Sequence, residues 1–208
     1  MKGDFMKGLY RDFFLHFDII VMGVLFLVGI IYSVGLHLSW LTVLIFIIGL
    51  IFFMFSEYVT HRFIFHIKAP KNKLLLKFMK RIHYDHHTYP DDLKLLFLPI
   101  WYSIPNLGSL CIIYFLISKD LIQTIAFGSG LVFMLLVYEW KHYVAHRPIK
   151  PITKVGRQIK KLHILHHFKN ENFWYGVSTP IFDGIFGTLK DEKEVVTSNT
   201  AKSLEERM

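Results

Sequence analysis

The chain has 208 residues, the length of one domain, and 53% of them are hydrophobic whereas only 19% are charged. This composition, with 20 phenylalanines, is typical of an integral membrane protein. Its only cysteine, Cys111, lies in an apolar run, which excludes disulfides and a thiolate metal site. The net charge of +8 is distributed between hydrophobic stretches, so we expect anionic lipid headgroups as its partner, and no nucleic acid.

Four apolar stretches predict helices that cross a membrane, because each approaches the length needed to traverse the hydrocarbon core. They are residues 19–36, 40–56, 95–117 and 121–140. Residues 1–18 predict an interfacial helix ahead of the first span. Pro99 and Pro105 interrupt the third stretch, which is therefore either a kinked span or a re-entrant hairpin.

Two further helices are predicted outside the spans, over residues 74–87 and 153–168, and both are basic and end in histidines. The sequence thus predicts a single membrane-embedded domain over residues 1–190. Residues 191–208 are polar and predict a flexible tail to which we assign no function.

Ten of the twelve histidines occur in four sequence clusters, each at the end of an apolar stretch or just beyond one. His142 and His146 are four residues apart, which places both on one face of a helix. The pattern His-x-x-His-His occurs twice among the others. Such clustering favours a metal site over isolated polar side chains. The ten positions are His61, His66, His83, His86, His87, His142, His146, His163, His166 and His167.

The basic residues predict the orientation of the chain in the membrane. The turns at residues 35–39 and 118–120 contain only one of the 24 basic residues, Lys119. By the positive-inside rule, residues 61–94 and the region after residue 140 then lie in the cytoplasm. All four clusters emerge on that side, of an ER membrane or a bacterial inner membrane, where they can form one site.

Neutral imidazole binds iron, copper, zinc and nickel, whereas calcium and magnesium prefer oxygen. Ten ligands are too many for one ion, but an even division gives five to each of two six-coordinate ions and leaves one position open on each. Structural zinc takes four ligands, and catalytic zinc takes three and a water. The count therefore favours a redox-active pair of iron ions with O2 as co-substrate, for which zinc can substitute in purified protein.

Other chemistries lack their motifs. The sequence contains no His-Glu-x-x-His of a zinc protease, no Gly-x-Gly-x-x-Gly followed by an acidic residue, and no serine nucleophile elbow. A haem with two histidine ligands would leave eight of the ten histidines unexplained.

Four motifs resemble those of the integral-membrane fatty acid hydroxylase and sterol desaturase superfamily. They are Glu57-Tyr58-x-x-His61-Arg62-Phe-x-Phe-His66, His83-x-x-His86-His87-x-x-Pro90-x-Asp92, His142-Tyr143-x-x-His146 and His163-x-x-His166-His167-Phe168. A later segment, Tyr175-Gly-Val-Ser-x-Pro-x-x-Asp183-x-x-Phe186-Gly-Thr188, is most similar to the fatty acid 2-hydroxylase branch.

The resemblance implies that the ten histidines hold a two-metal centre, which uses O2 and electrons to hydroxylate or desaturate lipid C–H bonds. We predict no catalytic residues beyond these ligands. One departure is Arg147, which stands where many members have a further histidine. The sequence also has no cytochrome b5 domain with a His-Pro-Gly-Gly motif, so we expect electrons from a separate cytochrome b5-like or ferredoxin-like donor with its reductase.

Four carboxylates are candidates to accept the second N–H of a ligand histidine and so fix its tautomer: Glu57, Asp85, Glu139 and Asp183. The alternative is that they are interfacial carboxylates paired with nearby lysine or arginine.

The predicted fold is all-α, with four transmembrane helices and a cytoplasmic helical cap that carries the histidine-rich two-metal site. The predicted function is an O2-dependent di-iron lipid hydroxylase that acts at carbon 2 of a fatty acyl chain, free or in a sphingolipid or another membrane lipid. Two alternatives stay open. One is a lipid, sterol or carotenoid desaturase or hydroxylase of the same superfamily. The other is a metal-handling membrane protein, although ligands gathered on one side argue against transport.

Overall fold

The computed structural model describes residues 2–207, and among these residues it contains helices and no strand, which confirms the predicted all-α class. Residues 1 and 208, the outermost positions of the predicted domain and tail, lie outside this range. The chain forms two compact units. Unit 1 consists of Met1–Phe53 and Leu98–Val137, and unit 2 of Met54–Phe97 and Tyr138–Met208.

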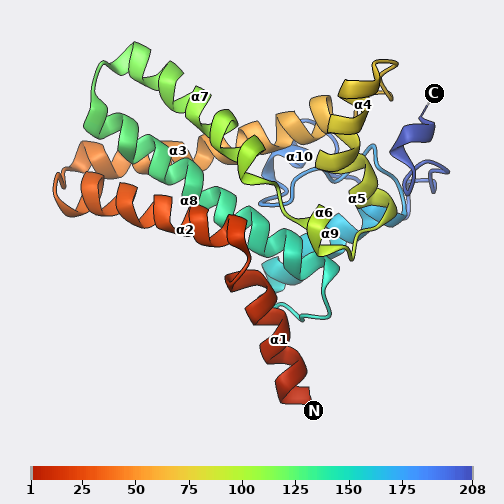
Figure 1. Cartoon of the computed structure of the whole chain (residues 1–208). Helices are drawn as coiled ribbons and strands as arrows, with labels where there is room; N and C mark the ends of the chain where they lie inside the picture. Colours follow the sequence, from red (N-terminus) through yellow and green to blue (C-terminus); the bar gives the residue numbers. More distant parts are fainter. Residues whose placement is uncertain (1, 208) are drawn as a thin grey trace. The chain divides into compact units, whose positions relative to one another are not determined.

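Unit 1 is built from one charged helix, α1, and from longer apolar helices, drawn in red, orange and green in Figure 1. They are α1 (Lys2–Phe14), α2 (Phe17–Ile30) with the π-helical turn η1 (Ile31–Gly35), α3 (Trp40–Thr60), α7 (Ile100–Ser118) and α8 (Leu121–His146). The last residues of α3 and α8 belong to unit 2. Half of the most apolar 18-residue window of α8 is buried, against 11–17% in the other spans, so α8 is the central helix.

Helices α3 and α8 approach until their backbones touch. A Cβ on Gly49 would lie 2.3 Å from the carbonyl oxygen of Phe127, and one on Gly130 would lie 2.2 Å from that of Phe46. Small residues allow such close contact between membrane helices. Helix α2 also packs on α8, through the rings of Phe26 and Phe133, whose centroids are 5.2 Å apart.

Four helical stretches are long and apolar enough to cross a membrane, which agrees with the four predicted spans. They are Phe17–Gly35, Trp40–Phe65, Leu93–Ser118 and Leu121–His146. The third is no re-entrant hairpin. Pro99 precedes the single helix α7, and Pro105 lies near its start, where the missing N–H frees only the carbonyl of Trp101.

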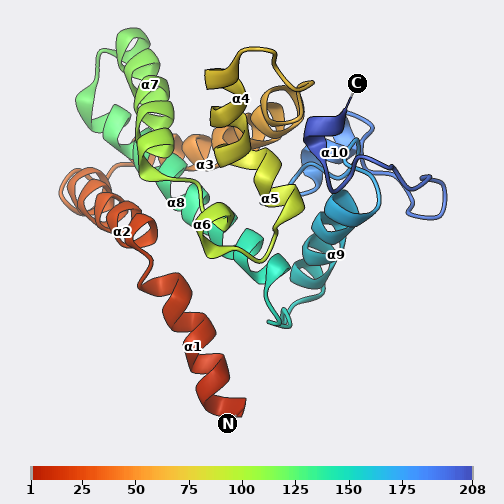
Figure 2. The ribbon, with the colours of Figure 1, turned by 45° about the vertical axis from the view of Figure 1, so that its right-hand side comes forward.

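Unit 2 carries shorter helices around the ends of α3 and α8 (Figure 2). They are η2 (His61–Phe65), α4 (Lys73–Met79), η3 (Lys80–Tyr84), α5 (Asp85–Thr88), α6 (Leu93–Leu96), α9 (Lys154–Phe168), α10 (Ile181–Ile185) and η4 (Leu204–Glu206). The side chain of Asn72 caps α4 by accepting from two backbone N–H groups, and that of Thr153 caps α9 by accepting from Gly156.

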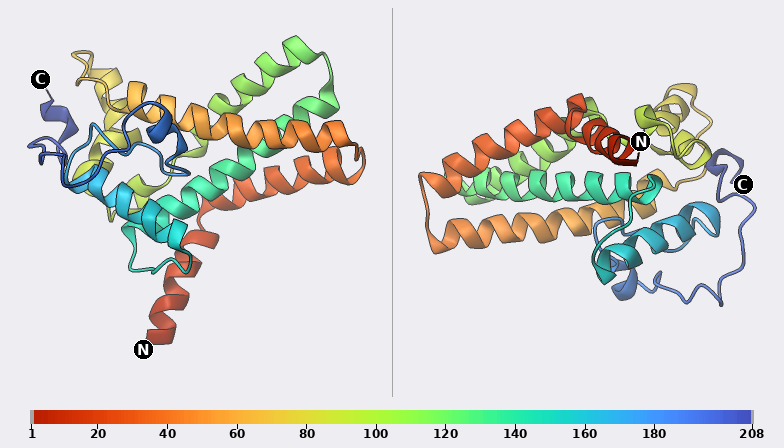
Figure 3. Two further views of the ribbon diagram at one scale, coloured as in Figure 1. Left: turned by 180° about the vertical axis from the view of Figure 1, so that it is seen from behind. Right: turned by 90° about the horizontal axis from the view of Figure 1, so that it is seen from below.

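After α9 the chain returns along that helix, as both panels of Figure 3 show in blue. Trp174 is fully buried there against Leu162 of α9 and Val195 of the returning segment. Its indole N–H donates to the carbonyl of Lys190 at 3.0 Å. Burial of this aromatic ring fixes the returning segment against the histidine-bearing helix.

Candidate metal centre

The structure brings all ten predicted ligand histidines together in unit 2, each no more than 8% exposed. They form two groups of five, and the candidate ligand atoms within each group all lie within 4.8 Å of one another. We call His61, His66, His83, His87 and His166 the first histidine group, and His86, His142, His146, His163 and His167 the second histidine group.

Each His-x-x-His-His motif divides its members between the two groups. From the first motif, His83 and His87 enter the first group, whereas His86 enters the second. From the motif on α9, His166 enters the first group, whereas His163 and His167 enter the second. Both motifs therefore bridge the two sites, and their helices fix the sites relative to each other.

Two π-helical turns contribute ligands to the first group. His61 and His66 are five residues apart, a spacing that an α-helix would place on different faces. The π turn η2 begins at His61, and its i→i+5 pattern brings residues five apart above one another. His83 lies in the second such turn, η3. Departures of this kind from the α-helix are frequent at functional sites.

The spacing of the ring nitrogens fits a coordination sphere. In the first group, the Nε2 atom of His83 lies 3.2, 2.9 and 3.1 Å from those of His61, His66 and His87. In the second group, His142 and His86 approach to 2.8 Å. With metal–nitrogen bonds of about 2.0–2.1 Å, neighbouring positions of an octahedral ion are about 3 Å apart, whereas those of a tetrahedral ion are about 3.4 Å apart.

Main-chain carbonyls fix the tautomer of four candidate ligands. The Nδ1–H group of each donates to a carbonyl oxygen, so its Nε2 atom carries a lone pair. The pairs are His61 with Tyr175 at 2.5 Å, His166 with Phe173 at 2.7 Å, His87 with Ala201 at 2.8 Å and His142 with Leu96 at 3.0 Å. Three of these lone pairs converge in the first group, where they repel one another unless a cation binds between them. The donor set therefore fits a metal ion.

Of the ten histidines in the two groups, those outside the spans are held neutral. Burial lowers the pKa of each of them below its usual value, in His87 to about 3. The same direction and cause hold for His66, His83, His86, His163, His166 and His167. Metal binding requires neutral imidazole, so at neutral pH these side chains are ready to coordinate without losing a proton.

The loop that supplies the Tyr175 carbonyl is held by Asp183. Its carboxylate accepts from the backbone N–H groups of Tyr175 and Gly176, both at 2.8 Å, and from the Thr188 hydroxyl at 2.6 Å. A Cβ at Gly176 would lie 2.0 Å from the carbonyl oxygen of Thr179, so only glycine fits there. These contacts fix the position of the Tyr175 carbonyl, which accepts the Nδ1–H of His61.

The other three candidate carboxylates lie in different surroundings. Glu57 accepts from the backbone N–H of Val177 at 2.7 Å and from the hydroxyl of Ser178, which anchors the same loop. Asp85 is half-exposed and 3.8 Å from the Lys80 ammonium, an ordinary surface ion pair. Glu139 is buried on α8, and its role stays a prediction. The four histidine rings described above thus donate to main-chain carbonyls and not to carboxylates. Glu57 and Asp183 instead hold the loop that supplies one of these carbonyls, that of Tyr175.

Sequence analysis missed the carbonyl acceptors and the contribution of the last residues of the chain. Main-chain oxygens leave no signal in side-chain identity. Residues 191–208 were assigned no role because they are polar, yet Ala201 supplies an acceptor and Arg207 donates to the backbone of His66 at 2.7 Å.

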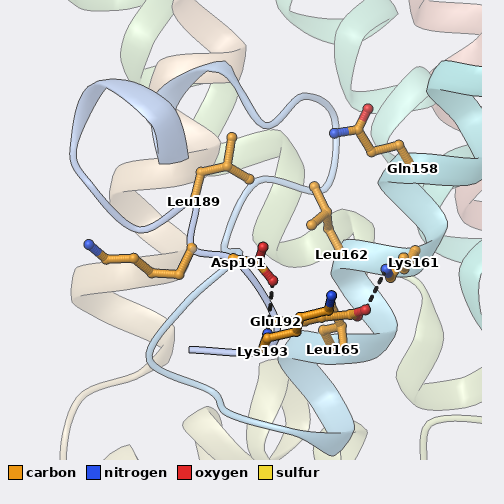
Figure 4. A pocket seen from close by; sticks show the side chains of 9 residues that line it. Gln158, Lys161, Leu162, Leu165, Leu189, Asp191, Glu192 and Lys193 are labelled. Atoms are coloured by element: carbon orange, nitrogen blue, oxygen red, sulfur yellow. Dashed lines mark hydrogen bonds and ion pairs between the residues drawn. The ribbon is translucent and has the colours of Figure 1, made fainter. Parts of the chain in front are cut away.

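A surface cavity of about 440 Å³ lies on another face of α9 (Figure 4). Gln158, Lys161, Leu162 and Leu165 of α9 line it together with residues 189–193, and Lys161 pairs with Glu192 at 2.9 Å. None of the ten histidines lines this cavity. It is therefore separate from the candidate metal centre.

Comparison with known proteins identifies relatives. The family model for fatty acid hydroxylase matches residues 46–188. The chain is 34% identical over 157 residues to the fatty acid 2-hydroxylase of Mus musculus, a match that covers 72% of this chain and 40% of the mouse protein. It is 34% identical over 154 residues to a dihydroceramide fatty acyl 2-hydroxylase of Arabidopsis thaliana, covering 71% and 61% of the two chains.

A solved structure also resembles this chain. It is that of full-length scs7p, in which only the hydroxylase domain is visible, and it superimposes with a TM-score of 0.76 at 25% identity. The match covers 86% of this chain and 69% of that one. The chain thus spans about two fifths of the length of the mouse relative and about three fifths of the plant relative.

Proposed function

Since the chain belongs to the fatty acid hydroxylase family, we propose that it is an O2-dependent lipid hydroxylase that acts at carbon 2 of a fatty acyl chain. The acyl chain is either free or part of a sphingolipid or another membrane lipid. The observation that carries the proposal is the division of ten buried histidines into two groups of five with coordination spacing. The names of the relatives point to the same reaction.

The metal we propose is iron, one ion in each histidine group. Five nitrogen ligands leave one position of a six-coordinate ion open, which suits O2 chemistry better than a closed structural zinc site. Two iron ions bound here would supply the activation of O2 and the oxidation of the C–H bond. The protein holds the ligands neutral, directs their Nε2 atoms and excludes water through burial.

The places of the candidate ligands along the chain support attack at carbon 2. The apolar stretch Trp40–Phe65 contains His61 near its end, and Leu121–His146 contains His142 and His146 in its last turns. Ligands at span ends favour a centre near the headgroup boundary rather than at the middle of the bilayer. A lipid that enters from the membrane then presents the carbons beside its carbonyl, whereas a mid-chain carbon would require the chain to bend.

Hydroxylation by O2 needs two electrons and two protons, because one oxygen atom enters the C–H bond and the other leaves as water. We propose a cytochrome b5-like or ferredoxin-like donor, with its reductase, as the electron source.

The product tests the proposal directly. Cells that express the protein, grown under heavy-isotope O2, should accumulate 2-hydroxy acyl lipids with the label in the new hydroxyl. Fragmentation mass spectrometry of total lipids, compared with cells that lack the gene, locates the label. Label at a mid-chain or sterol-ring carbon would contradict the position. A new double bond without label would favour a desaturase, and unchanged lipids in cells that make the metal-loaded protein would favour a metal-handling role.

We further propose that the histidine groups face the cytoplasm, of an ER membrane or a bacterial inner membrane. The turns between the first and second and between the third and fourth spans carry only Lys119, whereas the other 23 basic residues lie in the N-terminal segment, in residues 61–94 and after residue 140. Cysteines introduced one at a time at positions 37, 70, 119 and 160 should be labelled from outside, inside, outside and inside, respectively. If positions 70 and 160 report opposite sides, the orientation is wrong.

A further inference from the structure

The segment formed by residues 198–207 lies against the first histidine group. The carbonyl of Ala201 accepts the Nδ1–H of His87 at 2.8 Å, and Arg207 donates to the carbonyl of His66 at 2.7 Å. Both histidines belong to the first group. We propose that residues 198–207, which we call the clamp segment, hold the metal site of the first histidine group specifically and make it the tighter of the two. This inference rests on the proposed two-metal centre.

Arg207 joins three parts of unit 2. Besides the His66 carbonyl, its guanidinium donates to the side-chain oxygen of Asn172 at 2.8 Å and lies 3.6 Å from the carboxylate of Glu171. Glu171 is only 1% exposed and also accepts from the Thr200 hydroxyl at 2.6 Å. The planar guanidinium can serve several acceptors at once, which the single ammonium of a lysine cannot do in the same geometry.

The clamp segment is fixed by burial as well as by polar contacts. Leu204 is 1% exposed and packs against Met79 and Tyr84, on the helical stretch that carries His83. The hydroxyl of Thr88 donates to the carbonyl of Lys202 at 3.1 Å. The segment therefore lies along the same stretch that bears His83 and His87, and its position is coupled to theirs.

The two histidine groups differ in this support. In the first group, the rings of His61, His87 and His166 donate to main-chain carbonyls. In the second group, within residues 2–207, the one main-chain carbonyl found to serve in this way is that of Leu96, for His142. Among the described residues, no group accepts from the Nδ1 atoms of His86, His163 and His167. Fixed acceptors orient a ligand and raise its basicity, so the first group should bind its metal more tightly.

The clamp segment lies beyond residues 46–188, to which the family model matches. The match to the family model therefore does not describe its contacts.

Arg207→Met in the full chain tests the clamp. Metal-loaded protein is dialysed against a series of chelators of increasing strength, and the metal retained per chain is measured by elemental analysis. We expect the affinity of one of the two sites to fall roughly 10- to 100-fold, the range for loss of a group that orients a ligand. Glu206→Gln is the matched control, because Glu206 is the exposed neighbour of Arg207, and it should retain metal like the wild type. Arg207→Lys should lose less than Arg207→Met, since an ammonium can still donate to the His66 carbonyl.

A second substitution identifies the site. His163→Ala removes a ligand of the second histidine group, so the metal that remains reports the first group. Adding Arg207→Met to this variant should release the remaining metal to weaker chelators. Equal retention with and without Arg207→Met would overturn the clamp.

The outcomes separate the clamp from the proposed function. Wild-type protein that binds two metals, together with an Arg207→Met variant that retains both equally well, would contradict the clamp alone. Wild-type protein that binds fewer than two would contradict the two-metal centre. If Arg207→Met does not give protein with the wild-type circular dichroism and elution volume, Arg207→Lys carries the test. It should show a partial loss at one site, and unchanged retention at both would overturn the clamp.

Discussion

Substitution of His86, His142 or His166 by alanine is expected to reduce lipid hydroxylation to below detection while membrane insertion stays intact. Each side chain is buried and supplies one of five nitrogens to its group. A neighbour cannot replace it, because each of the other nine histidines already supplies its own nitrogen to one of the two groups. Mass spectrometry of labelled lipids and fractionation of membranes measure the two properties separately.

His37 and His16 provide controls for this series, because neither belongs to a histidine group. His37 packs against Tyr32 in unit 1, and His16 lies 3.7 Å from Asp18 in the same unit. Their alanine variants should remain active. Wild-type activity in any two of the three ligand variants would show that the cluster is structural.

Asp183→Ala should cause the largest loss of stability. It leaves the N–H groups of Tyr175 and Gly176 without their acceptor, and it removes one of the two partners of the Thr188 hydroxyl, the other being the Tyr58 hydroxyl. Each unsatisfied buried donor costs about 1–3 kcal/mol, so the free energy of unfolding should fall by about 3 kcal/mol or more. The melting temperature in detergent measures this, and metal content should fall with it because the Tyr175 carbonyl positions His61.

Two variants serve as controls for the effect of Asp183→Ala on stability. Asp183→Asn keeps one carbonyl oxygen and should be less destabilising than alanine. Asp191→Ala removes an exposed carboxylate that caps a single backbone N–H, that of Lys193, and should leave the melting temperature nearly unchanged. A similar loss in Asp183→Ala and Asp191→Ala would show that the Asp183 contacts do not hold the loop.

The spans were predictable because hydrocarbon thickness sets their length and the apolar runs have few interruptions. The ten histidines were predictable for a related reason, since they occur in clusters at the ends of helical stretches. The even division into five and five also follows from ligand count. It is the assignment of each histidine to its group that required the structure, because each His-x-x-His-His motif serves both groups.

The remaining features depend on backbone geometry. The π turns at His61–Phe65 and Lys80–Tyr84 have no side-chain signature, so the five-residue spacing of His61 and His66 had no explanation in the sequence. The main-chain carbonyls that accept from the histidines have no side-chain signature either. The four carboxylates are candidates for contact with histidines because carboxylates often make such contacts in metal sites, and pairing with lysine or arginine is the alternative. In this chain Glu57 and Asp183 instead hold the loop that carries a carbonyl.

Residues 191–208 illustrate the limit of composition. A polar segment predicts little burial, yet Leu204 is 1% exposed and Ala201 is 2% exposed. The contacts with the first histidine group come from the carbonyl oxygen of Ala201 and from the guanidinium of Arg207. The sequence does not predict them, because a main-chain carbonyl is common to all residues and a charged side chain is ordinarily solvated.

The metal content of the purified protein tests the central claim most directly. The ten buried histidines form two groups of five, and each group should hold one metal ion. Protein expressed with ample iron, purified gently and shown to be folded by circular dichroism should therefore contain two metal ions per chain by elemental analysis. A folded sample that contains one metal ion per chain, or none, would contradict the two-metal centre.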